Sequence, residues 1–575
     1  MPTSRADSLS PTREDTLPFV YDVLIVGAGP CGLAVAARLR EQTPSALFTD
    51  EEHHRYHWIN KHGGHASIKN RKTGRTRQLE PGSKAPLSKQ IGQVQETRPE
   101  TPSRRSASEP SMLVLDSSGD SWMAKWKRLF SQLEISHLRS PMFFHPDPHD
   151  RDGLLAYAHS QGRECECLEI AGCVGKELSK HQMKKKRNSR KNGEQARPSI
   201  TIDERDRKDY FTPPSDLFQS YCDFIAKRYD LLDTDLIRKA AVDEIDYDFI
   251  PQLSADDKLF TIRAGKDTYF AKSVVLAVGA GNAPSIPKPF PQSGCPCACH
   301  AFTGQDEALA ARVRAKRPTN VLVIGGGLTS AQIADQAIRR GATKVFHVMR
   351  GPMKIKPFDV DLSWMGKFRN HEKATFWSAD TDEERSDLVK SARGGGSITP
   401  RFVKISEQHV RSGKLSIHTH TTVEQTNYDP LEQTWSIKTS PPIADLPAIH
   451  FVYFATGVQS NVERLPYLQR IVEKYPVECF DGMPALTDDL MWKPDVPLFM
   501  TGRFAALRVG PGAANLEGAR LGAERIVWGL QDVLGDEGSG GSADEGLSPE
   551  ASQGQSEYRF AAGIGSRYES LEVEE

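Results

Sequence analysis

The chain has 575 residues, more than one hydrophobic core usually supports, so we expect two packed domains with additional unstructured segments. Lysine and arginine together number 74 and aspartate and glutamate 75, and this balance excludes a whole-protein charge as the basis for binding nucleic acid or an anionic membrane. No apolar run approaches the roughly 18 residues of a membrane span, and the first 20 residues lack a signal-peptide core. Nine cysteines without framework spacing fit reduced thiols, so the sequence predicts a cytoplasmic protein.

The fold is expected to be organised around residues 21–33, YDVLIVGAGPCGL, which combine a strand, a glycine turn and a helix start. This order is typical of dinucleotide binding, in which Gly27 allows a tight turn, Gly29 lets a pyrophosphate approach the backbone, and Gly32 packs the helix against the strand. Pro30 opens the helix, whose free N–H groups would hold the pyrophosphate. The alternative is another kind of glycine-rich turn between a strand and a helix.

An acidic residue about 20 positions further on supports the dinucleotide interpretation, because it can bind a ribose hydroxyl. Asp50, followed by Glu51, ends the next expected strand, residues 45–50. The histidines between residues 53 and 65 match no zinc-binding spacing, and we expect no metal site in the chain.

Two polar stretches interrupt the first half of the chain. Residues 70–111 and 183–199 are predicted to be low-complexity insertions, the second of them basic. A nuclear-import or nucleic-acid role for the basic run stays open, but a solvated surface loop is the favoured interpretation. Between them, aromatic residues at helical spacing from Trp122 to Phe130 predict a helix, and a second helix is expected to begin at about Ser215.

A second glycine motif repeats the opening design. Residues 321–324 read as a strand, Gly325 to Gly327 as the turn, and Thr329 and Ser330 as the first turn of a helix. Ser330 takes the third glycine position, where a small residue still permits close packing and a hydroxyl can reach a phosphate. We therefore expect a second dinucleotide site.

The strand after this motif ends in a cation where the first motif has an acid. Arg350, with Lys354 and Lys356 just beyond it, would accommodate a 2′-phosphate that an acid would repel, which favours NADPH over NADH. A surface arginine on an NADH site or on a degenerate site is the alternative.

Two such motifs about 300 residues apart predict FAD at the first and NADPH at the second. The fold class is accordingly α/β, an FAD-binding Rossmann-like domain with an inserted NADPH-binding Rossmann-like domain. The strand ending in Thr456 and Gly457 should return the chain to the first domain. After Gly502 a helix from about Ala514 is expected, and its N-terminus, with Asn515 and Leu516, would face the flavin.

These observations give the expected domain boundaries along the chain. They are a disordered N-terminus at 1–18, the first part of the FAD domain at 19–315, the NADPH domain at 316–449, the C-terminal part of the FAD domain at 450–533, and a disordered acidic tail at 534–575.

The motifs GAGPCGLA, GGGLTSAQ and FATG resemble those of the two-dinucleotide-domain flavoprotein monooxygenases, and within them the N-hydroxylating lysine and ornithine N-monooxygenases. The segment from Trp58 through MLVLD, SWMAKW and LRSP is similar in order to that family's flavin-facing stretch, which implies flavin contacts for Trp58 and Met123. The resemblance implies that a C4a-hydroperoxyflavin, formed with NADPH and molecular oxygen, oxygenates a small nucleophile, with an amine nitrogen favoured. Because this chemistry belongs to the cofactor, we single out no catalytic side chain.

Other functions remain open on the sequence. The same architecture serves Baeyer–Villiger and sulfur oxygenases and NADPH reductases or oxidases that insert no oxygen. The chain also resembles eukaryotic oxidative-stress growth-inhibitor proteins, which implies a non-catalytic regulator. Substrate identity and a homo-oligomeric state are likewise open.

Overall fold

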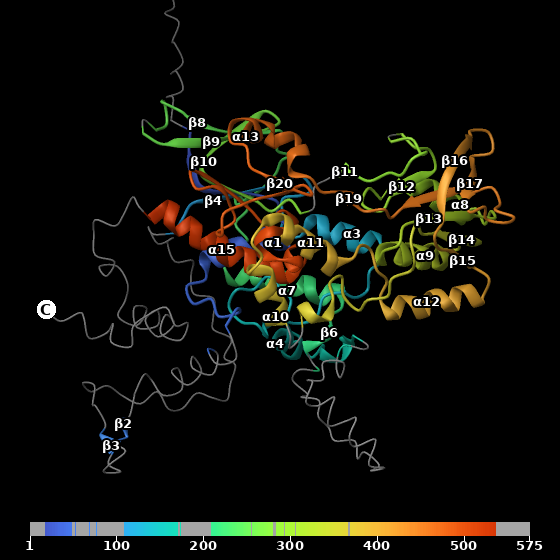
Figure 1. Ribbon diagram of the computed structural model, residues 1–575, viewed down its shortest axis with the longest axis horizontal. Helices are drawn as coiled ribbons and strands as arrows, with labels where there is room; N and C mark the ends of the chain where they lie inside the picture. The colour runs from blue at the N-terminus through green and yellow to red at the C-terminus, as the bar shows by residue number, and fades with distance from the viewer. Residues whose placement is uncertain are drawn as a thin grey trace, which may run out of the picture.

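The computed structural model describes residues 18–48, 109–170, 209–254, 256–279, 283–292, 294–304, 306–365 and 369–535, with residues 52, 68–69, 76–77, 173 and 207 standing alone. The predicted N-terminal segment to residue 17, the basic run at 183–199, nearly all of the insertion at 70–111, and the tail from residue 536 lie outside the described residues. The described chain forms two lobes, each built on its own sheet, and we call them the large lobe and the small lobe (Figure 1).

The large lobe contains an eight-stranded sheet with the order β22-β23-β10-β1-β4-β7, to which β9 adds beside β10 and β8 beside β9. Strands β4, β1, β10 and β23 run parallel, while β22 lies antiparallel at the edge. Its strands are β1 (Val20–Val26), β4 (Met112–Asp116), β7 (Ile237–Lys239), β8 (Glu244–Phe249), β9 (Lys258–Ala264), β10 (Asp267–Leu276), β22 (Met491–Lys493) and β23 (Val496–Met500).

Buried apolar side chains explain why β1 lies in the middle of this sheet. Val23, Leu24 and Ile25 are fully buried, as expected of a parallel strand that is covered on both faces. Helices α1 (Pro30–Arg40), α7 (Ser215–Arg228) and α15 (Leu516–Gly535) pack beside the sheet (Figure 1). The start of α7 at Ser215 agrees with the sequence prediction.

The small lobe contains a five-stranded parallel sheet with the order β12-β18-β13-β14-β15. Its strands are β12 (Ala298–His300), β13 (Asn320–Ile324), β14 (Lys344–Val348), β15 (Leu415–His418) and β18 (Phe451–Phe454). The helices α8 (Glu307–Arg314), α9 (Leu328–Arg340) and α12 (Pro400–Arg411) and the hairpin of β16 (Thr422–Asp429) and β17 (Thr434–Ser440) complete this lobe.

The expectation that the strand at 450–457 returns the chain to the first sheet is wrong. Strand β18 pairs with β13 and β12, and its four residues are all buried in the small lobe. The chain leaves this sheet only after Gly457, through β19 (Val458–Gln459), which pairs with β11 (Ala283–Pro284). Residues 298–300 also belong to the small sheet, so this sheet begins before the predicted boundary at 316.

Two helices that lie in sequence between strands of the small lobe pack into the core of the large lobe. Helices α10 (Arg369–Trp377) and α11 (Asp382–Arg393) contribute Phe376, Val389 and Ala392 to the core cluster that contains β1. The described parts of this segment, 358–365 and 369–392, therefore pack with the first sheet, although they lie within the range predicted for the second domain.

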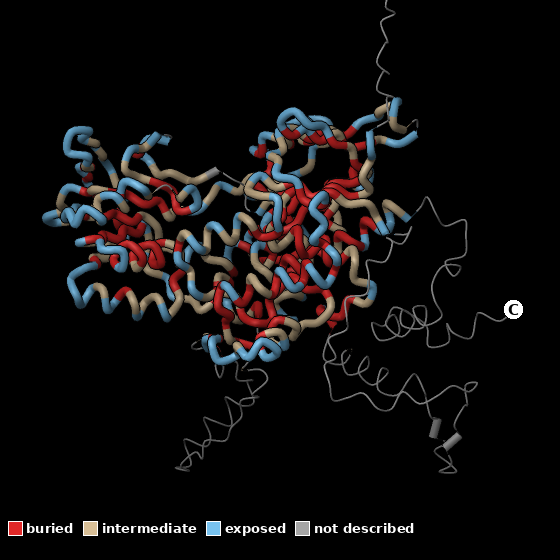
Figure 2. The backbone as a smooth tube through the Cα atoms, turned by 180° about the vertical axis from the view of Figure 1, so that it is seen from behind, coloured by how far each residue is buried: buried red, intermediate tan, exposed pale blue. Residues whose placement is uncertain are grey.

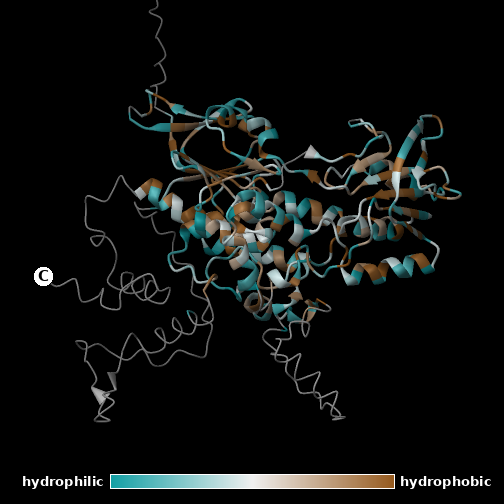
Figure 3. Cartoon of the chain, viewed as in Figure 1, coloured by the Kyte–Doolittle hydropathy of each residue, from teal (hydrophilic) through white to brown (hydrophobic). Residues whose placement is uncertain are grey.

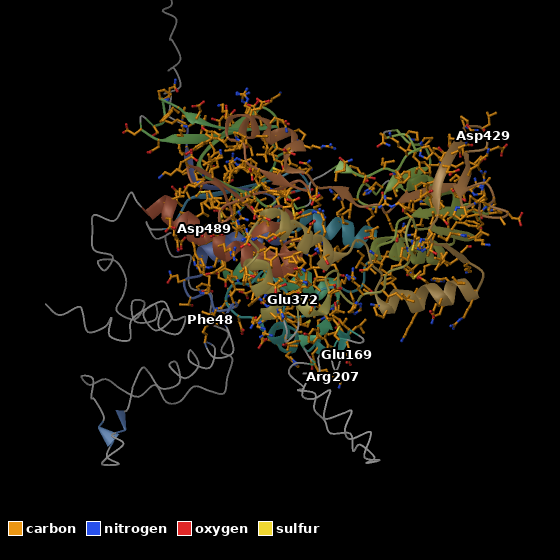
Figure 4. All side chains as sticks on the ribbon, viewed as in Figure 1. Phe48, Glu169, Arg207, Glu372, Asp429 and Asp489 are labelled. Carbon is orange, nitrogen blue, oxygen red and sulfur yellow. The ribbon has the colours of Figure 1, made fainter. Side chains whose placement is uncertain are left out.

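The figures follow this division. Buried residues concentrate inside each lobe (Figure 2), and hydrophobic and hydrophilic residues alternate along α12 (Figure 3). Figure 4 places Asp429 on the hairpin at the outer end of the small lobe and Asp489 beside α15.

None of the helices in the described ranges is both long enough and apolar enough to cross a lipid bilayer.

The remaining described elements are short or peripheral. They are β2 (Ile68–Lys69), β3 (Thr76–Arg77), α3 (Ala124–Gln132), α4 (Gly153–Ser160), η1 (Glu164–Glu166), β5 (Leu168–Glu169), β6 (Phe211–Thr212), η2 (Leu362–Trp364), η3 (Val462–Arg464), η4 (Pro466–Leu468), α13 (Gln469–Lys474), β20 (Cys479–Phe480), β21 (Met483–Pro484), η5 (Gly502–Ala505), α14 (Ala506–Val509) and η6 (Pro511–Ala514).

Candidate functional site

The first glycine turn joins β1 to α1, as the sequence predicts. Gly27 has a φ of +112°, and a Cβ there would lie 2.5 Å from the carbonyl oxygen of Ala277. A Cβ at Gly32 would lie 2.0 Å from the carbonyl oxygen of Gly27, so the helix can approach the strand only without a side chain. At Gly29 a Cβ would meet nothing within 4 Å. The turn is therefore closed on the protein side and open at the helix N-terminus, where Pro30 is the first helical residue.

Two neighbouring residues hold this turn through its backbone. The amide of Ala28 donates to Asp116 Oδ2 at 2.8 Å, and the carbonyl of Ala28 accepts from the amide of Met123 at 2.7 Å. Met123 is buried with a φ of +65° and precedes α3. Sequence reasoning placed Met123 at the flavin but missed Asp116, although an acid at the end of a strand was the available signal.

The strand expected at residues 45–50 is not formed over its described part, residues 45–48. Residues 45–48 form a turn, because the amide of Phe48 donates to the carbonyl of Ser45, and the strand beside β1 is instead β4, which ends at Asp116. Asp50, Glu51 and Trp58 lie outside the described residues.

The C-terminal part of the chain closes on the first turn. Gly502 follows β23, and a Cβ on it would lie 3.7 Å from Cys31 Sγ in α1. Burial raises the pKa of the Cys31 thiol to about 11, so the thiol is protonated at neutral pH. Helix α15 begins at Leu516 rather than at Ala514, and Asn515 caps it by accepting from the amides of Glu517 and Gly518. The Asn515 side chain is thus engaged in capping the helix.

Of the aromatic residues in the predicted helix near residue 122, Trp122 is buried in the core, and Trp126 and Phe130 are partly buried against it. Trp122 is 3% exposed and donates from its indole N–H to the carbonyl of Leu231 at 2.9 Å. Trp126 stacks on Phe130 with a centroid distance of 3.7 Å. These contacts favour a packing role over a direct role at a cofactor.

The second glycine turn joins β13 to α9 with the same construction. A Cβ at Gly325 would lie 2.3 Å from the carbonyl oxygen of Ala455, which matches the closeness of Gly27 to Ala277. A Cβ at Gly326 would meet nothing within 4 Å, and Gly327 precedes the helix. Each turn therefore abuts the end of a neighbouring parallel strand, β10 in the large lobe and β18 in the small lobe. This repetition explains why the chain carries AVG after β10 and ATG after β18.

The first turn of α9 differs from its expected role at one position. Thr329 is half-buried at the helix start, but Ser330 is fully buried and its hydroxyl donates to the carbonyl of Gly327 at 2.7 Å. The expectation that the Ser330 hydroxyl reaches a phosphate is wrong, because the hydroxyl is inside the protein and closes the turn.

Thr456 and Gly457 bind the linker between the lobes. The Thr456 hydroxyl donates to the carbonyl of Ser285, and the carbonyl of Gly457 accepts from the amide of Ser285 at 3.1 Å. His300, which is buried, lies with its Nε2 2.8 Å from the carbonyl of Gly457. Cofactor contacts for Thr456 and Gly457 remain a proposal, since these hydrogen bonds join the motif to β11.

His347 supports the second turn and was not found from the sequence. Its Nε2 lies 2.8 Å from the carbonyl oxygen of Gly325, and its side chain is fully buried in β14. Burial lowers the pKa of His347 to about 4, so the ring is neutral at physiological pH and Nε2–H is the donor.

Arg350 follows β14 and is exposed. Among the described residues, no carboxylate forms an ion pair with it. Lys354 and Lys356, in contrast, cap the C-terminus of α11: Lys354 Nζ donates to the carbonyl of Gly394, and Lys356 Nζ donates to that of Arg393 at 3.4 Å. Of the three cations predicted near a 2′-phosphate, Arg350 is the one that remains available.

Both turns end in a glycine that caps a helix N-terminus, which is the arrangement that binds a pyrophosphate. The space beside Gly29 is open to 4 Å. In the small lobe the corresponding space is bounded by Gly396, whose backbone contacts Gly327.

A family model described as L-lysine 6-monooxygenase/L-ornithine 5-monooxygenase matches residues 207–457 of the chain. No curated protein sequence matches the chain.

Solved structures of N-hydroxylating enzymes have the same fold. Ornithine hydroxylase (PvdA) from Pseudomonas aeruginosa is 15% identical with a TM-score of 0.55, and the match covers 90% of this chain and 100% of that one. L-lysine 6-monooxygenase from Pseudomonas syringae is 15% identical with a TM-score of 0.52, covering 89% and 100%. The Kutzneria sp. 744 ornithine N-hydroxylase KtzI, with reduced FAD, NADP+ and L-ornithine, is 13% identical with a TM-score of 0.55, covering 89% and 99%. The predicted α/β fold and the resemblance to this group of flavoprotein monooxygenases are confirmed.

Proposed function

Because the chain has the fold of the lysine and ornithine N-hydroxylases and matches their family model, we propose that it is an FAD- and NADPH-dependent monooxygenase that hydroxylates an amine nitrogen. In the net reaction NADPH supplies two electrons, one atom of O2 is added to the nitrogen, and the other leaves as water. FAD supplies the redox and oxygen-activating chemistry when it is bound.

The observation that carries this proposal is the repeated construction of the two glycine turns. A Cβ at Gly29, the N-cap of α1, would meet nothing within 4 Å, and one at its counterpart Gly327, the N-cap of α9, would meet Gly396 Cα at 3.7 Å. Gly27 and Gly325, in contrast, are pressed against the neighbouring strand. The large lobe would hold FAD at the first turn, with Asp116 and Met123 fixing the turn's backbone. The small lobe would hold NADPH at the second, where His347 orients the Gly325 carbonyl and Arg350 is available for the 2′-phosphate.

The substrate class follows from the comparisons with known enzymes. One of the matching structures is a cadaverine monooxygenase, and others act on lysine or ornithine, so a primary amine on an alkyl chain is the common substrate feature. We assign that class to this protein and place it in the cytosol, where NADPH is supplied. None of its nine cysteines, all of which the structure describes, forms a disulfide, which supports a reducing compartment.

Labelled oxygen tests this function. The purified protein, loaded with FAD, should oxidise NADPH in the presence of a primary amine and give a product carrying one atom of 18O from 18O2. Ornithine, lysine and cadaverine form the first panel, and thioethers and ketones form the second. Rapid NADPH oxidation that yields only hydrogen peroxide with every amine would identify an oxidase instead, and label in a thioether or ketone product would identify another oxygenase.

A further inference from the structure

Two chain segments run side by side between the lobes. We call residues 353–358 and 393–398 the connector pair. The amide of Ile398 donates to the carbonyl of Lys354 at 2.8 Å, and the amide of Lys356 donates to the carbonyl of Ile398 at 3.1 Å. Ile398 packs in the core of the small lobe, whereas Phe358 packs in that of the large lobe. The pair therefore spans the junction between the lobes.

Arg139 of the large lobe binds both members of the connector pair at once. Its guanidinium donates to the carbonyls of Lys356 at 3.1 Å and Pro357 at 3.3 Å, and to that of Phe358. It also donates to the hydroxyl of Ser397 at 2.8 Å and to the carbonyl of Ser397 at 3.4 Å. Burial lowers the pKa of Arg139 to about 10, which still leaves the group charged at neutral pH. The planar, charged guanidinium can donate to all of these acceptors at once, whereas a lysine ammonium, which is a compact point charge, cannot.

The second connector contacts the large lobe and the glycine turn of the small lobe within four residues. At its start, Arg393 Nη1 donates to the carbonyl of Pro511 at 3.1 Å, in the turn that precedes α15 of the large lobe. Three residues later a Cβ on Gly396 would lie 3.0 Å from Cα and 3.1 Å from N of Gly327. A displacement of this short segment would therefore be transmitted to the glycine turn of the small lobe by direct backbone contact.

We propose that Arg139 is a positioning residue that holds the connector pair in place. Gly396 and the second glycine turn then stay at the distance from the large lobe that electron transfer between two bound dinucleotides requires. This inference rests on the proposed function for its role in transfer. The bonds from Arg139 to the connector pair, which we call the clamp, are present in the protein without nucleotides. A misplacement of about 1 Å between reacting groups can cost as much as 100-fold in rate, so loss of the clamp should reduce the rate of transfer more than the affinity.

The variant Arg139→Ala should fold, because other bonds keep the connectors in place. Lys354 still donates to the carbonyl of Gly394, and Lys356 still pairs with Asp361 at 2.7 Å. Arg163→Ala is the control, since the side chain of Arg163, among the residues that the structure describes, bonds Glu166 and Asp216 of the large lobe and nothing on the connector pair.

The first measurement needs no NADPH. Hydrogen exchange of the FAD-loaded protein should show the amides of Lys356 and Ile398 exchanging at least about fivefold faster in Arg139→Ala, because their local opening becomes easier. The amides of β13 should be unchanged in that variant, and Arg163→Ala should resemble the wild type throughout. Unchanged exchange at the connector pair would overturn the clamp whatever the enzyme does.

The second measurement separates positioning from binding. In anaerobic stopped-flow mixing, Arg139→Ala should reduce its flavin about 10- to 100-fold more slowly at saturating NADPH, with the apparent Kd for NADPH changed by less than about threefold. Arg139→Lys should not restore the rate, since its single ammonium cannot reach the carbonyls on both connectors. Faster exchange with an unchanged reduction rate would make Arg139 a structural residue only, which overturns the proposal. If NADPH does not reduce the wild-type protein, the proposed function is refuted. The hydrogen-exchange measurement then tests the clamp by itself.

A second variant keeps the test decisive if Arg139→Ala fails to fold. Gly396→Ala adds a methyl group that must push against Gly327, so it should slow flavin reduction in the same way. Gly351→Ala is its control, because a Cβ there meets nothing within 4 Å. Equal reduction rates in these two variants would contradict transmission through Gly396.

Discussion

Gly29 and Gly32 stand three residues apart in the first turn, yet the space around them differs. A side chain at Gly29 would enter open space, whereas one at Gly32 would collide with the carbonyl of Gly27. Gly29→Val should therefore fold with nearly unchanged thermal stability but purify without flavin, because the side chain occupies the approach of the pyrophosphate. The flavin content per protein and the melting temperature, measured together, check this. A Gly29→Val protein with full flavin content would exclude the first turn as the FAD site.

Gly32→Val provides the contrast to that variant. Its Cβ would lie 2.0 Å from a backbone oxygen, so the helix must move away from the strand and the fold should lose stability. Loss of flavin without loss of stability in Gly32→Val would mean that the two positions do not differ as the geometry requires.

Arg350 is the residue that should decide between the two nicotinamide cofactors. Removing a charge-assisted contact to a phosphate costs about 1.5–3 kcal/mol, so Arg350→Ala should weaken NADPH binding roughly 10- to 100-fold. NADH binding should change less than about twofold, since NADH lacks the 2′-phosphate. Equilibrium titrations with both cofactors measure the two effects. Equal losses for NADPH and NADH would refute the assignment.

His347 should make the protein sensitive to mild acid. Its folded pKa of about 4 lies below the ordinary value of 6.5, so the unfolded chain binds the extra proton first and stability falls as the pH drops from about 6.5 to 4. At pH 4.5 this one group accounts for roughly 2–3 kcal/mol. His347→Gln should flatten the stability profile in that window when urea unfolding is measured at several pH values. Part of the slope should remain, because His145 is buried with the same downward shift of its pKa to about 4. An unchanged slope in His347→Gln would contradict this explanation.

At the scale of elements, a buried ion pair fixes α15 against α1. Arg38 Nε lies 2.6 Å from Glu524 Oε2 and Arg38 Nη2 lies 2.9 Å from Oε1, with both side chains largely buried. Glu524→Gln leaves a buried guanidinium without its carboxylate, which should cost about 3–5 kcal/mol in the free energy of unfolding. The double variant Arg38→Met with Glu524→Leu should recover most of that loss. Denaturant unfolding compares the variants, and a loss below about 1 kcal/mol in the single variant would show that the pair is solvated.

Elements built from local contacts could be predicted from the sequence, and elements joined by distant contacts could not. The turn after β1 and the start of α7 depend on residues within one short segment, and both lie where the sequence places them. The sheet that receives β18 depends on pairing with β13, which is about 130 residues away, so the FATG motif was assigned to the wrong sheet. The same reason explains why Asp116 and His347 were missed, since each acts on a turn distant in sequence.

At the scale of the whole molecule, the described part of the chain passes between the lobes at two places. One is the pairing of β11 with β19, and the other is the connector pair that Arg139 binds. The helices α10 and α11 belong to the large lobe by packing, although they lie between strands of the small lobe in sequence. This interleaving means that the orientation of the two glycine turns is set by several separate contacts rather than by one flexible linker. It also explains why domain boundaries drawn from motif positions alone are inaccurate here.

We propose that the two glycine turns hold FAD and NADPH close enough to exchange electrons. The most direct measurement is an anaerobic titration of the purified protein with NADPH while the absorbance of its flavin is followed. We predict that the protein carries FAD and that about one equivalent of NADPH bleaches it, with NADH acting much more weakly. A protein that cannot retain FAD, or a flavin that stays oxidised in excess NADPH, would contradict the claim.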